Sequence, residues 1–574
     1  MPSTPKRSSG ASSTIMAWVF IAAVVAVVLA AINWGQAWMP VKGSKVSWNP
    51  IELIKYATAG QFHWSTGSTI LLVVLLIGIM VVLTFGYYFL IAPLLNRGKN
   101  EKTPVGRSIL SVMGLKPAAR KARQALDVPP DVKDEDVVVK VAYNGKTALW
   151  AQWEDAGWCY APQRAGKTLY IVVPAILEAI GPVLTTSTKV DVLFWTAIAR
   201  QEKGRVAVFD LDQISNWPDQ VRWNPISGCE DQNEALDRGL AWASAAPMKG
   251  TKNGDWFSGQ AAAVLGRLLH AAAIGHKDMG DVIKWIMDPG NREPVDILTG
   301  FGYNDVFTGH LKERLSSRAG ETQDSIKATL MGLVEPLVSE RVLSQFRVPT
   351  SIAFKAEDFL AGNNTLYVLA DGADSRMAPL VSMFTDYVFR TAKRLSQQRP
   401  GGRLWPPLSM LLDEAPNVAA LPDMTSVLTD SGGRGIRVLG FSQSFSQNVS
   451  RWGREVAETI EETANVKFLL PGLKASNLKE YAEEMGVRDE QRSSYSVGRG
   501  GGSRTVSTAE KAVMRAEELK QLEVGQALMV YRNVPPTVVR LEAVFERKDA
   551  AGIKDQKRQA EALAGRIAVE EAGR

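Results

Sequence analysis

The sequence predicts an α/β protein that combines a mostly parallel sheet, an inserted all-α domain and two N-terminal transmembrane helices. Short apolar segments alternate with helical segments from residue 136 onward, and this alternation stops between residues 231 and 340. Alternating strands and helices favour a doubly wound parallel sheet. Two nearly unbroken apolar stretches precede residue 93, and each has the roughly 20 residues needed to cross a bilayer.

The apolar stretches carry the charge pattern of a membrane anchor. Lys6 and Arg7 precede the first stretch, and eight Lys or Arg residues against one acid follow the second, between residues 97 and 123. The positive-inside rule places both flanks in the cytoplasm. We therefore predict a multi-pass protein of the cell membrane whose large domain lies in the cytoplasm. A cleaved signal peptide is the alternative for the first stretch.

These patterns divide the chain into seven regions. In order, they are a disordered cytoplasmic segment at 1–14, a transmembrane region at 15–92, a basic linker at 93–135, the first part of the sheet domain at 136–230, the all-α insertion at 231–340, the second part of the sheet domain at 341–545 and a charged tail at 546–574. Within the transmembrane region we expect spans at 15–32 and 70–92 around an external loop at 33–67. We expect the tail to be a short helix or disordered.

The charge and the cysteine and histidine content limit the partners and metal sites that can be expected. A formal net charge of +6 is compatible with nucleic acid or anionic lipid as a partner and selects neither. Cys159 and Cys229 are the only cysteines, which argues against a disulfide framework and suits a reducing compartment. The four histidines do not cluster, so a zinc site is not expected.

The sheet domain contains the predicted strands and helices. Strands are expected at 137–141, 157–161, 182–187, 205–210, 364–370, 408–412, 436–441, 466–470 and 527–532. Helical spacing of apolar residues predicts helices at 167–179, 191–200 and 378–396. The segment 493–507 is rich in Gly, Ser and Arg, and we expect a loop there.

A phosphate-binding loop follows the strand predicted at 157–161. Residues 161–168 read Ala-Pro-Gln-Arg-Ala-Gly-Lys-Thr, with Ala161 in place of the usual first glycine. Such a loop aims backbone amides at phosphate oxygens. The predicted nucleotide-binding residues of the loop are Arg164, Ala165, Gly166, Lys167 and Thr168. Lys167 would reach the β- and γ-phosphates, and Thr168 would bind Mg²⁺ through its hydroxyl group. Alanine at 161 is tolerated only if its backbone stays outside the region reserved for glycine.

Two acids end an apolar strand far downstream. The strand at 408–412 is followed by Asp413 and Glu414, which complete a nucleotide triphosphatase site when they accompany a phosphate loop. We predict that Asp413 holds the metal, directly or through water, and that Glu414 orients and deprotonates the attacking water. The alternative is a strand that simply ends at solvent with two acids. Loop and acids together predict a RecA-like P-loop NTPase domain with ATP and Mg²⁺ as cofactors.

Gln443 is a third candidate for catalysis. It follows the buried strand at 436–441, where a polar side chain would sense the γ-phosphate. We therefore count Gln443 with Lys167 and Glu414 as the predicted catalytic residues. An ordinary amide at a strand end is the alternative.

Other polar residues allow both a functional and a purely structural interpretation. Lys189 falls near the same sheet edge, because ligands collect at the carboxyl ends of parallel strands, but it is equally compatible with a solvated loop residue. Arg434 and Arg437 precede the strand at 436–441, and either one is an arginine-finger candidate or a partner in a surface salt bridge. Cys159 lies within an apolar strand and is interpreted as a core residue.

Several short motifs accompany one another along the chain: 162–168 in the phosphate loop, 183–189, Phe209-Asp210, 222–225, 411–417, 435–437 and 441–444. In combination they resemble the type IV secretion coupling proteins of the TraG/TraD class, especially the Gram-positive or actinobacterial branch. The resemblance covers roughly residues 140–545. It implies a membrane-anchored, RecA-like hexameric ATPase that links relaxase-bound DNA to a secretion channel, with 231–340 as an all-α domain facing the cytoplasm.

The sequence therefore favours an ATP-driven DNA translocase for conjugation. The expected partners are DNA with its relaxase, the channel proteins of a type IV secretion system, the membrane and further copies of the chain in a homo-hexamer. A nucleotide-regulated membrane platform that recruits secretion substrates is one alternative, and an FtsK-like DNA motor is another. The long helical insertion and the two spans argue against the FtsK-like motor.

Overall fold

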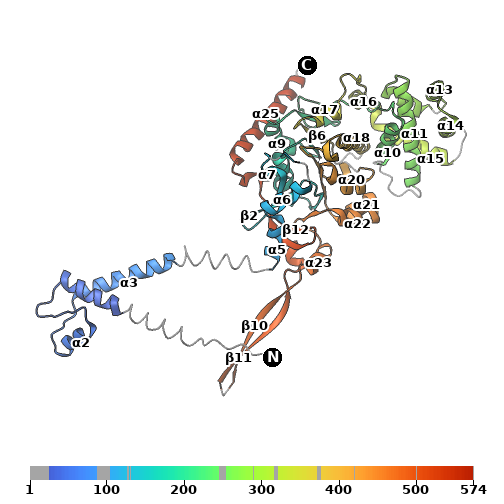
Figure 1. Ribbon diagram of the computed structural model, residues 1–574. Coiled ribbons are helices and arrows are strands. Elements are labelled where there is room, and N and C mark those ends of the chain that lie inside the picture. Colours follow the sequence, from blue (N-terminus) through green and yellow to red (C-terminus); the bar gives the residue numbers. More distant parts are fainter. Residues whose placement is uncertain are drawn as a thin grey trace. The chain divides into compact units, whose positions relative to one another are not determined.

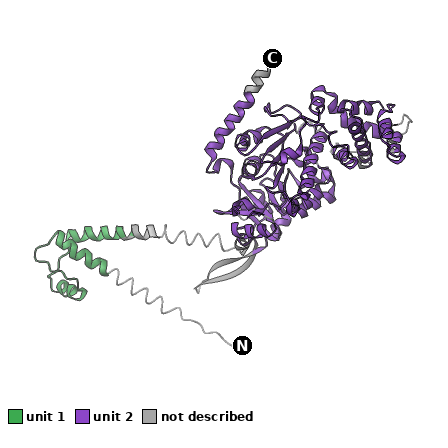
Figure 2. Cartoon of the chain, turned by 45° about the horizontal axis from the view of Figure 1, so that its top comes forward, with its two compact units in different colours: residues 1–103 green, residues 104–574 purple. Residues whose placement is uncertain are grey.

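The computed structural model describes residues 25–86, 104–125, 128–129, 131–244, 254–288, 290–315, 321–371, 376–418, 421–498 and 501–572. The chain divides into two compact units, residues 1–103 and 104–574, which Figure 2 colours separately. The segment at 1–14, predicted to be disordered, lies outside the described residues.

The described residues of the first unit, 25–86, are mainly helical. Residues 25–38 are helical, and α2 (Pro50–Thr58) and α3 (Thr66–Gly86) follow. Among the described residues, no helix combines the length and the apolar character that a membrane crossing requires. Residues 15–24 and 87–92, which belong to the two predicted spans, lie outside the described residues, and both spans stay predictions.

The second unit is built on an 11-stranded sheet. Its strand order is β2-β1-β13-β12-β9-β3-β8-β7-β4-β6-β5. In chain order, the strands of this sheet are β1 (Val138–Asn144), β2 (Thr147–Gln152), β3 (Gly157–Tyr160), β4 (Val183–Ser187), β5 (Val206–Asp210), β6 (Thr365–Leu369), β7 (Leu408–Leu412), β8 (Ile436–Ser442), β9 (Val466–Leu469), β12 (Gln526–Tyr531) and β13 (Val534–Arg540). The run from β9 to β5 is parallel, and the strands on the other side of β9 pair antiparallel. The prediction of a mostly parallel sheet is confirmed.

The parallel strands alternate their side chains between two apolar cores. Trp158 of β3 belongs to one core and Cys159 to the other, and Phe209 and Val208 of β5 divide in the same way. The first core is packed by α10 (Gln232–Ser244), α11 (Gly254–Ile274) and α18 (Ala378–Gln397), and the second by α8 (Val173–Glu178) and α9 (Asp191–Gln201). Helices thus cover both faces, which is why the parallel strands are mostly apolar. Cys159 is a core residue, as its strand predicts.

The remaining helices surround this framework. In the sheet domain they are α5 (Pro104–Met113), α6 (Leu115–Ala125), α7 (Asp134–Val137), α17 (Ala356–Leu360), α19 (Ala415–Val418), α20 (Met424–Asp430), α21 (Phe445–Trp452), α22 (Arg454–Thr463), α23 (Ala475–Glu484), α24 (Ala516–Lys520) and α25 (Ala550–Ala572), with the short helices η2 (Thr168–Val172), η4 (Pro400–Gly402), η5 (Gly432–Arg434) and η6 (Val544–Glu546). The helical segment after α11 contains α12 (Met279–Met287), α13 (Glu293–Gly300), α14 (Asp305–Leu315), α15 (Glu321–Val334), η3 (Glu335–Val338) and α16 (Glu340–Phe346). Figure 1 shows α10, α11, α13, α14 and α15 grouped on one side of the sheet domain.

One segment corrects the sequence prediction. The segment at 493–507 is not a loop, because it lies in a hairpin formed by β10 (Val487–Gly498) and β11 (Gly501–Ala512). The two strands pair antiparallel over twelve residues each and form a sheet of their own. Val497, Thr505 and Val506 are β-branched residues that favour an extended backbone between the serines. The Gly and Ser content of this segment was therefore not sufficient to predict a loop.

Parts of the expected linker and tail are helical. α5 and α6 occupy residues 104–125 of the basic linker, and Ala118, Ala119 and Ala122 of α6 are buried. The tail forms α25, whose Ala560 is buried in the second core. Alanine faces let these helices approach the sheet domain closely, although the segments look polar when their charges are counted.

Gly440 of β8 yields a first prediction, because it gives Trp158 room in the first core. A Cβ atom at position 440 would lie 2.2 Å from the Trp158 ring, which is fully buried and donates a 2.9 Å hydrogen bond from Nε1 to Oγ of Ser442. We expect Gly440→Ala to lower the free energy of unfolding by about 3 kcal/mol, the upper part of the range for overpacked cores. Urea denaturation of residues 104–574 would measure this change. Gly433→Ala is the matched control, because no atom lies within 4 Å of a Cβ there. Equal midpoints for the two variants would contradict the prediction.

Candidate nucleotide-binding site

The phosphate loop and the two acids meet at one edge of the sheet. β8 lies between β3 and β7, and all three strands run parallel. The chain leaves β3 into the loop at 161–167 and leaves β7 into Asp413 and Glu414. Because the carboxyl ends of parallel strands share an edge, this order places both motifs side by side.

Lys167 joins the loop to the acids. Its Nζ atom forms an ion pair with Oδ1 of Asp413 and lies 4.0 Å from Oε1 of Glu414. The same Nζ atom lies 5.9 Å from the centre of the Phe441 ring. The structure therefore brings together three of the predicted site residues although 246 positions separate Lys167 from Asp413 (413 − 167).

Asp413 is nearly inaccessible at the end of β7, with 5% of its surface exposed. Burial raises the pKa of its carboxyl group, and the neighbouring ammonium of Lys167 opposes this shift. Oγ1 of Thr186 donates a hydrogen bond of 2.9 Å to the backbone carbonyl oxygen of Asp413, which ties the end of β7 to β4. Thr186 was not foreseen from the sequence. The feature of the sequence that could have indicated Thr186 is a hydroxyl side chain near the end of β4, the strand beside β7.

The donor set fits Mg²⁺. Oδ1 of Asp413 is buried and, among the described residues, makes no hydrogen bond beyond its ion pair with Lys167. A carboxylate and a threonine hydroxyl are typical partners for a cation that keeps several waters and also binds phosphate. In the part of the chain that the structure describes, no group of three or more His, Cys, Asp or Glu residues could hold a metal. Thr168 and Asp413 stay the predicted Mg²⁺ ligands, and nucleotide phosphates and water would complete the coordination.

The loop backbone combines two left-handed residues with an ordinary alanine. Arg164 and Gly166 have φ angles of 64° and 91°. A Cβ atom at Gly166 would lie 2.9 Å from the ring of Tyr170, so glycine is required there. Ala161 is not among the described residues with positive φ, and its N–H donates a 2.9 Å hydrogen bond to the carbonyl oxygen of Ser442. Alanine therefore extends the strand pairing, and this backbone path does not need the missing first glycine.

The helix after the loop begins with a π-helical turn. This turn, η2, spans Thr168–Val172, and the N–H of Val173 donates to the carbonyl oxygen of Thr168. α8 follows, so the single helix predicted at 167–179 consists of two parts. π-Helical turns frequently occur at functional sites. Ala165 is buried, whereas Lys167 and Thr168 are half-buried at the start of this helix.

Glu414 and Gln443 follow adjacent strands at the same edge. Glu414 has a φ angle of 50°, a strained conformation for a residue with a side chain. The N–H of Gln443 donates a 2.7 Å hydrogen bond to Oε1 of Gln447 in α21. Both side chains are half-buried. The catalytic roles of Lys167, Glu414 and Gln443 stay predictions.

The two arginine-finger candidates have partners within their own domain. Arg437 is buried at the start of β8, where burial lowers its pKa to about 10, and its guanidinium lies 5.8 Å from the centre of the Trp153 ring. Arg434 forms an ion pair of 2.7 Å with Asp430. Arg437 therefore packs as a core residue, and Arg434 matches the salt-bridge reading. Lys189 is exposed beyond β4, and its role stays open.

A polar cluster behind the loop was not foreseen from the sequence. Tyr160, the last residue of β3, donates a hydrogen bond to Glu461 of α22, and Tyr481 of α23 donates to the same carboxylate. Lys467 of β9 lies 3.5 Å from Glu461. The cluster ties the strand that feeds the loop to three other elements. Its members carry no local signal, because 301 positions separate Tyr160 from Glu461.

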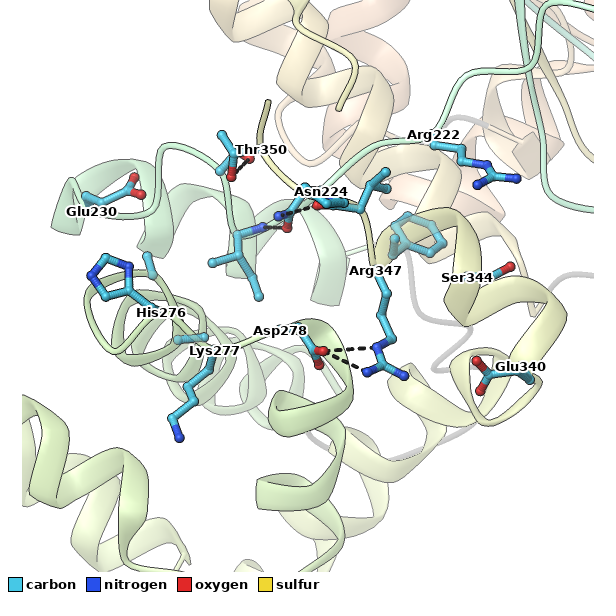
Figure 3. A pocket seen from close by; sticks show the side chains of 17 residues that line it. Arg222, Asn224, Glu230, His276, Lys277, Asp278, Glu340, Ser344, Arg347 and Thr350 are labelled. Carbon is cyan, nitrogen blue, oxygen red and sulfur yellow. Dashed lines mark hydrogen bonds and ion pairs between the residues drawn. The ribbon is translucent and has the colours of Figure 1, made fainter. Parts of the chain in front are cut away.

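A cavity of about 620 Å³ lies away from this site. Arg222, Asn224 and His276 are among its lining residues, and Figure 3 shows Asp278 and Arg347 facing each other across a 2.8 Å ion pair. None of the predicted site residues lines this cavity. The assignment of the nucleotide site therefore depends on the geometry of the loop and the acids.

Sequence comparisons show that the chain is similar to conjugation proteins. A family model described as the "TraM recognition site of TraD and TraG" matches residues 407–524. A conjugal transfer protein TraG of Escherichia coli is 26% identical over 339 residues, which cover 54% of this chain and 52% of that protein. A second protein of the same name and organism is 24% identical over 339 residues. The chain thus matches about half the length of these curated relatives.

Solved structures share the fold. The unbound structure of the bacterial conjugative coupling protein TrwBdeltaN70 has a TM-score of 0.52 and 14% identity, and the match covers 74% of this chain and 91% of that chain. TrwB with ADP and Mg²⁺ has a TM-score of 0.52 and 15% identity over the same shares of the two chains. TrwB with the GTP analogue GDPNP has a TM-score of 0.51 and 16% identity, and the match covers 74% of this chain and 92% of that chain.

The parallel sheet, the phosphate loop and the strand-end acids define a P-loop nucleotide-binding protein of the RecA-like fold. Within that class, the chain is similar to the conjugal transfer protein TraG and, in fold, to the conjugative coupling protein TrwB. The family resemblance of the sequence motifs is thereby confirmed. The assignment to the Gram-positive or actinobacterial branch stays a prediction.

Proposed function

We propose that this protein is a membrane-anchored ATPase that couples a relaxase-bound DNA substrate to a type IV secretion channel and drives DNA transfer in conjugation. The ion pair between Lys167 and Asp413 is the observation that carries the proposal, because it unites the two halves of a nucleotide triphosphatase site. The names of the TraG and TrwB relatives support conjugation as the process. The complex of TrwB with ADP and Mg²⁺ supports Mg²⁺ and an adenine nucleotide as ligands.

The residues of this chain divide the work of hydrolysis. Backbone amides of the loop and the ammonium of Lys167 bind phosphate oxygens, so Lys167 exchanges part of its contact with Asp413 for the nucleotide. Asp413 and Thr168 hold Mg²⁺, which neutralises phosphate charge when it is bound. Glu414 orients the attacking water and accepts its proton, and Gln443 contacts the γ-phosphate.

Membrane location and assembly belong to the same proposal. The spans at 15–32 and 70–92 anchor the chain as a multi-pass protein of the cell membrane, and the basic residues after the second span hold the large domain in the cytoplasm. A homo-hexamer would surround the DNA with equivalent loops, and the channel proteins would receive the DNA at the membrane. The basic composition of the chain is compatible with DNA as the substrate.

The proposal is tested by ATP hydrolysis with and without DNA, using residues 104–574, which form one compact unit. We expect DNA to stimulate turnover. The half-saturating DNA concentration should rise at least about tenfold between 50 and 200 mM salt. Each phosphate contact releases counterions when DNA binds, and two such contacts are enough to make the affinity this sensitive to salt. Single- and double-stranded DNA would be compared in the same assay. If the rate of ATP hydrolysis is the same with and without DNA at every salt concentration, the motor function is contradicted.

The recruitment platform stays a second candidate because of one observation. β10 and β11 form a two-stranded sheet that is not paired with the 11-stranded sheet. A two-stranded hairpin is marginally stable in water, so a bound partner would stabilise it. The family model that spans this hairpin is described as a recognition site for TraM. Nucleotide would then control recruitment rather than drive transport.

A further inference from the structure

An apolar surface lies directly beside the glycine of the phosphate loop. A Cβ atom at Gly166 would lie 2.9 Å from Cδ2 of Tyr170 and 3.2 Å from Cγ1 of Val524. Tyr170 is in η2, one turn beyond Lys167, whereas Val524 belongs to the segment that leads into β12. Two segments that are distant in sequence thus converge on the loop that is expected to hold the phosphates.

The surface continues away from the loop. The other edge of the Tyr170 ring faces Gly525, where a Cβ atom would lie 2.9 Å from Cε1 of Tyr170. Gly525 has a φ angle of 94°, so both the conformation and the space require glycine. Phe545 of η6 stands edge-on to Tyr170, with the ring centres 5.9 Å apart at an angle of 83°.

Solvent reaches this surface although its members are apolar. Val524 and Phe545 expose 58% and 56% of their surfaces, and Tyr170 is half-buried. The adjacent Val544 is buried with Val173 and Ile553, so η6 is anchored by Val544 and not by Phe545. Phe545 therefore leaves more than half of its surface available to a ligand.

We propose that Tyr170, Val524 and Phe545 form the subsite for the base of the nucleotide. This inference rests on the proposed function, because it assumes that the phosphates bind at Lys167. Phosphates held at the start of η2 direct the ribose and base past the first helical turn, where Tyr170 and its neighbours lie. Aromatic and aliphatic side chains bind a purine by stacking and burial of its faces.

The chemistry of the subsite predicts little discrimination between adenine and guanine. Val524, Phe545 and the ring faces of Tyr170 present apolar surface, and stacking tolerates different bases because each base has a π-face. Selectivity would have to come from backbone groups or from the hydroxyl group of Tyr170. We therefore expect the guanine analogue of a nucleotide to bind nearly as tightly as the adenine one.

The test separates the base from the phosphates. Binding of a non-hydrolysable ATP analogue and of inorganic tripolyphosphate, each with Mg²⁺, would be measured by titration calorimetry on the full chain in detergent. Phe545→Ala should weaken binding of the ATP analogue about tenfold and leave tripolyphosphate binding unchanged, since stacking on an aromatic side chain contributes about 1–3 kcal/mol per base. Val524→Ala should have a smaller effect in the same direction. Phe301→Ala is the matched control, because Phe301 is 63% exposed at the end of α13.

Each outcome decides the proposal. A Phe545→Ala protein that binds the ATP analogue as tightly as the parent overturns the base subsite, and so does an equal loss for both ligands. Phe545→Leu should restore part of the affinity by keeping an apolar contact. A separate variant, Lys167→Ala, reports on the underlying site. If it binds both ligands like the parent, the phosphate site itself is wrong, and the base subsite is overturned with it.

Discussion

Lys167→Ala should lower ATP turnover by about a thousandfold, the upper part of the range for loss of one preorganised group that stabilises transition-state charge. The ammonium group of Lys167 forms an ion pair with Asp413 and lies 4.0 Å from Glu414. It therefore lies next to the acids, where the charge of the phosphates would develop during hydrolysis. The variant should keep its fold. Asp413 already has a raised pKa because of its burial, and without Lys167 it can protonate instead of remaining as an unpaired buried charge.

The measurement combines turnover with localisation. Steady-state hydrolysis would be compared between the parent, Lys167→Ala and the control Lys146→Ala, which removes an exposed lysine at the turn between β1 and β2. Membrane fractionation should give the same distribution for all three proteins, since the predicted spans lie far from position 167 in the sequence. Parent-like turnover in Lys167→Ala would show that the nucleotide site has been assigned to the wrong residues.

Glu414→Gln should reduce ATP turnover by about 10²- to 10³-fold while nucleotide binding persists, because general base catalysis contributes on that order. The amide keeps the size of the side chain and its ability to accept a hydrogen bond, but it cannot take a proton from water. Binding of a non-hydrolysable analogue should stay close to the parent value, in contrast to Lys167→Ala. Glu484→Gln is the matched control, because Glu484 is exposed at the end of α23.

The same variant distinguishes a motor from a platform. If hydrolysis drives transfer, a cell that carries only Glu414→Gln should lose conjugative transfer together with ATP turnover. If nucleotide binding alone organises recruitment, transfer should continue at the parent frequency. Unimpaired transfer with absent turnover would therefore rule out the translocase and favour the platform.

The strands around the site were predictable because their signals are local. β3, β7 and β8 are mostly apolar and buried throughout, and each is followed by polar residues that mark a shared edge of a parallel sheet. The spacing within 161–168 and the pair Asp413–Glu414 predicted a nucleotide site at this edge. The ion pair between Lys167 and Asp413 is the consequence of that strand order.

The antiparallel part of the sheet was less predictable. β13 was not foreseen, because Pro535 and Pro536 lack the N–H that an inner strand normally donates. The structure accommodates them at an irregularity in the pairing with β12, between Met529 and Tyr531, while the pairing with β1 is registered only at Arg540. A strand can therefore contain two prolines if its neighbours leave those positions unpaired.

The sequence by itself determined the mostly parallel sheet and the order of motifs along the chain, and it predicted the residues that would bind phosphate and metal, because periodicity and motif spacing are properties of short segments. Only the tertiary structure decided which distant groups meet. It joined Tyr160 to Glu461, buried Arg437 inside its own domain and placed Val524 and Phe545 beside Tyr170. Such contacts depend on how strands are ordered and helices packed, and hundreds of intervening residues contribute to that outcome.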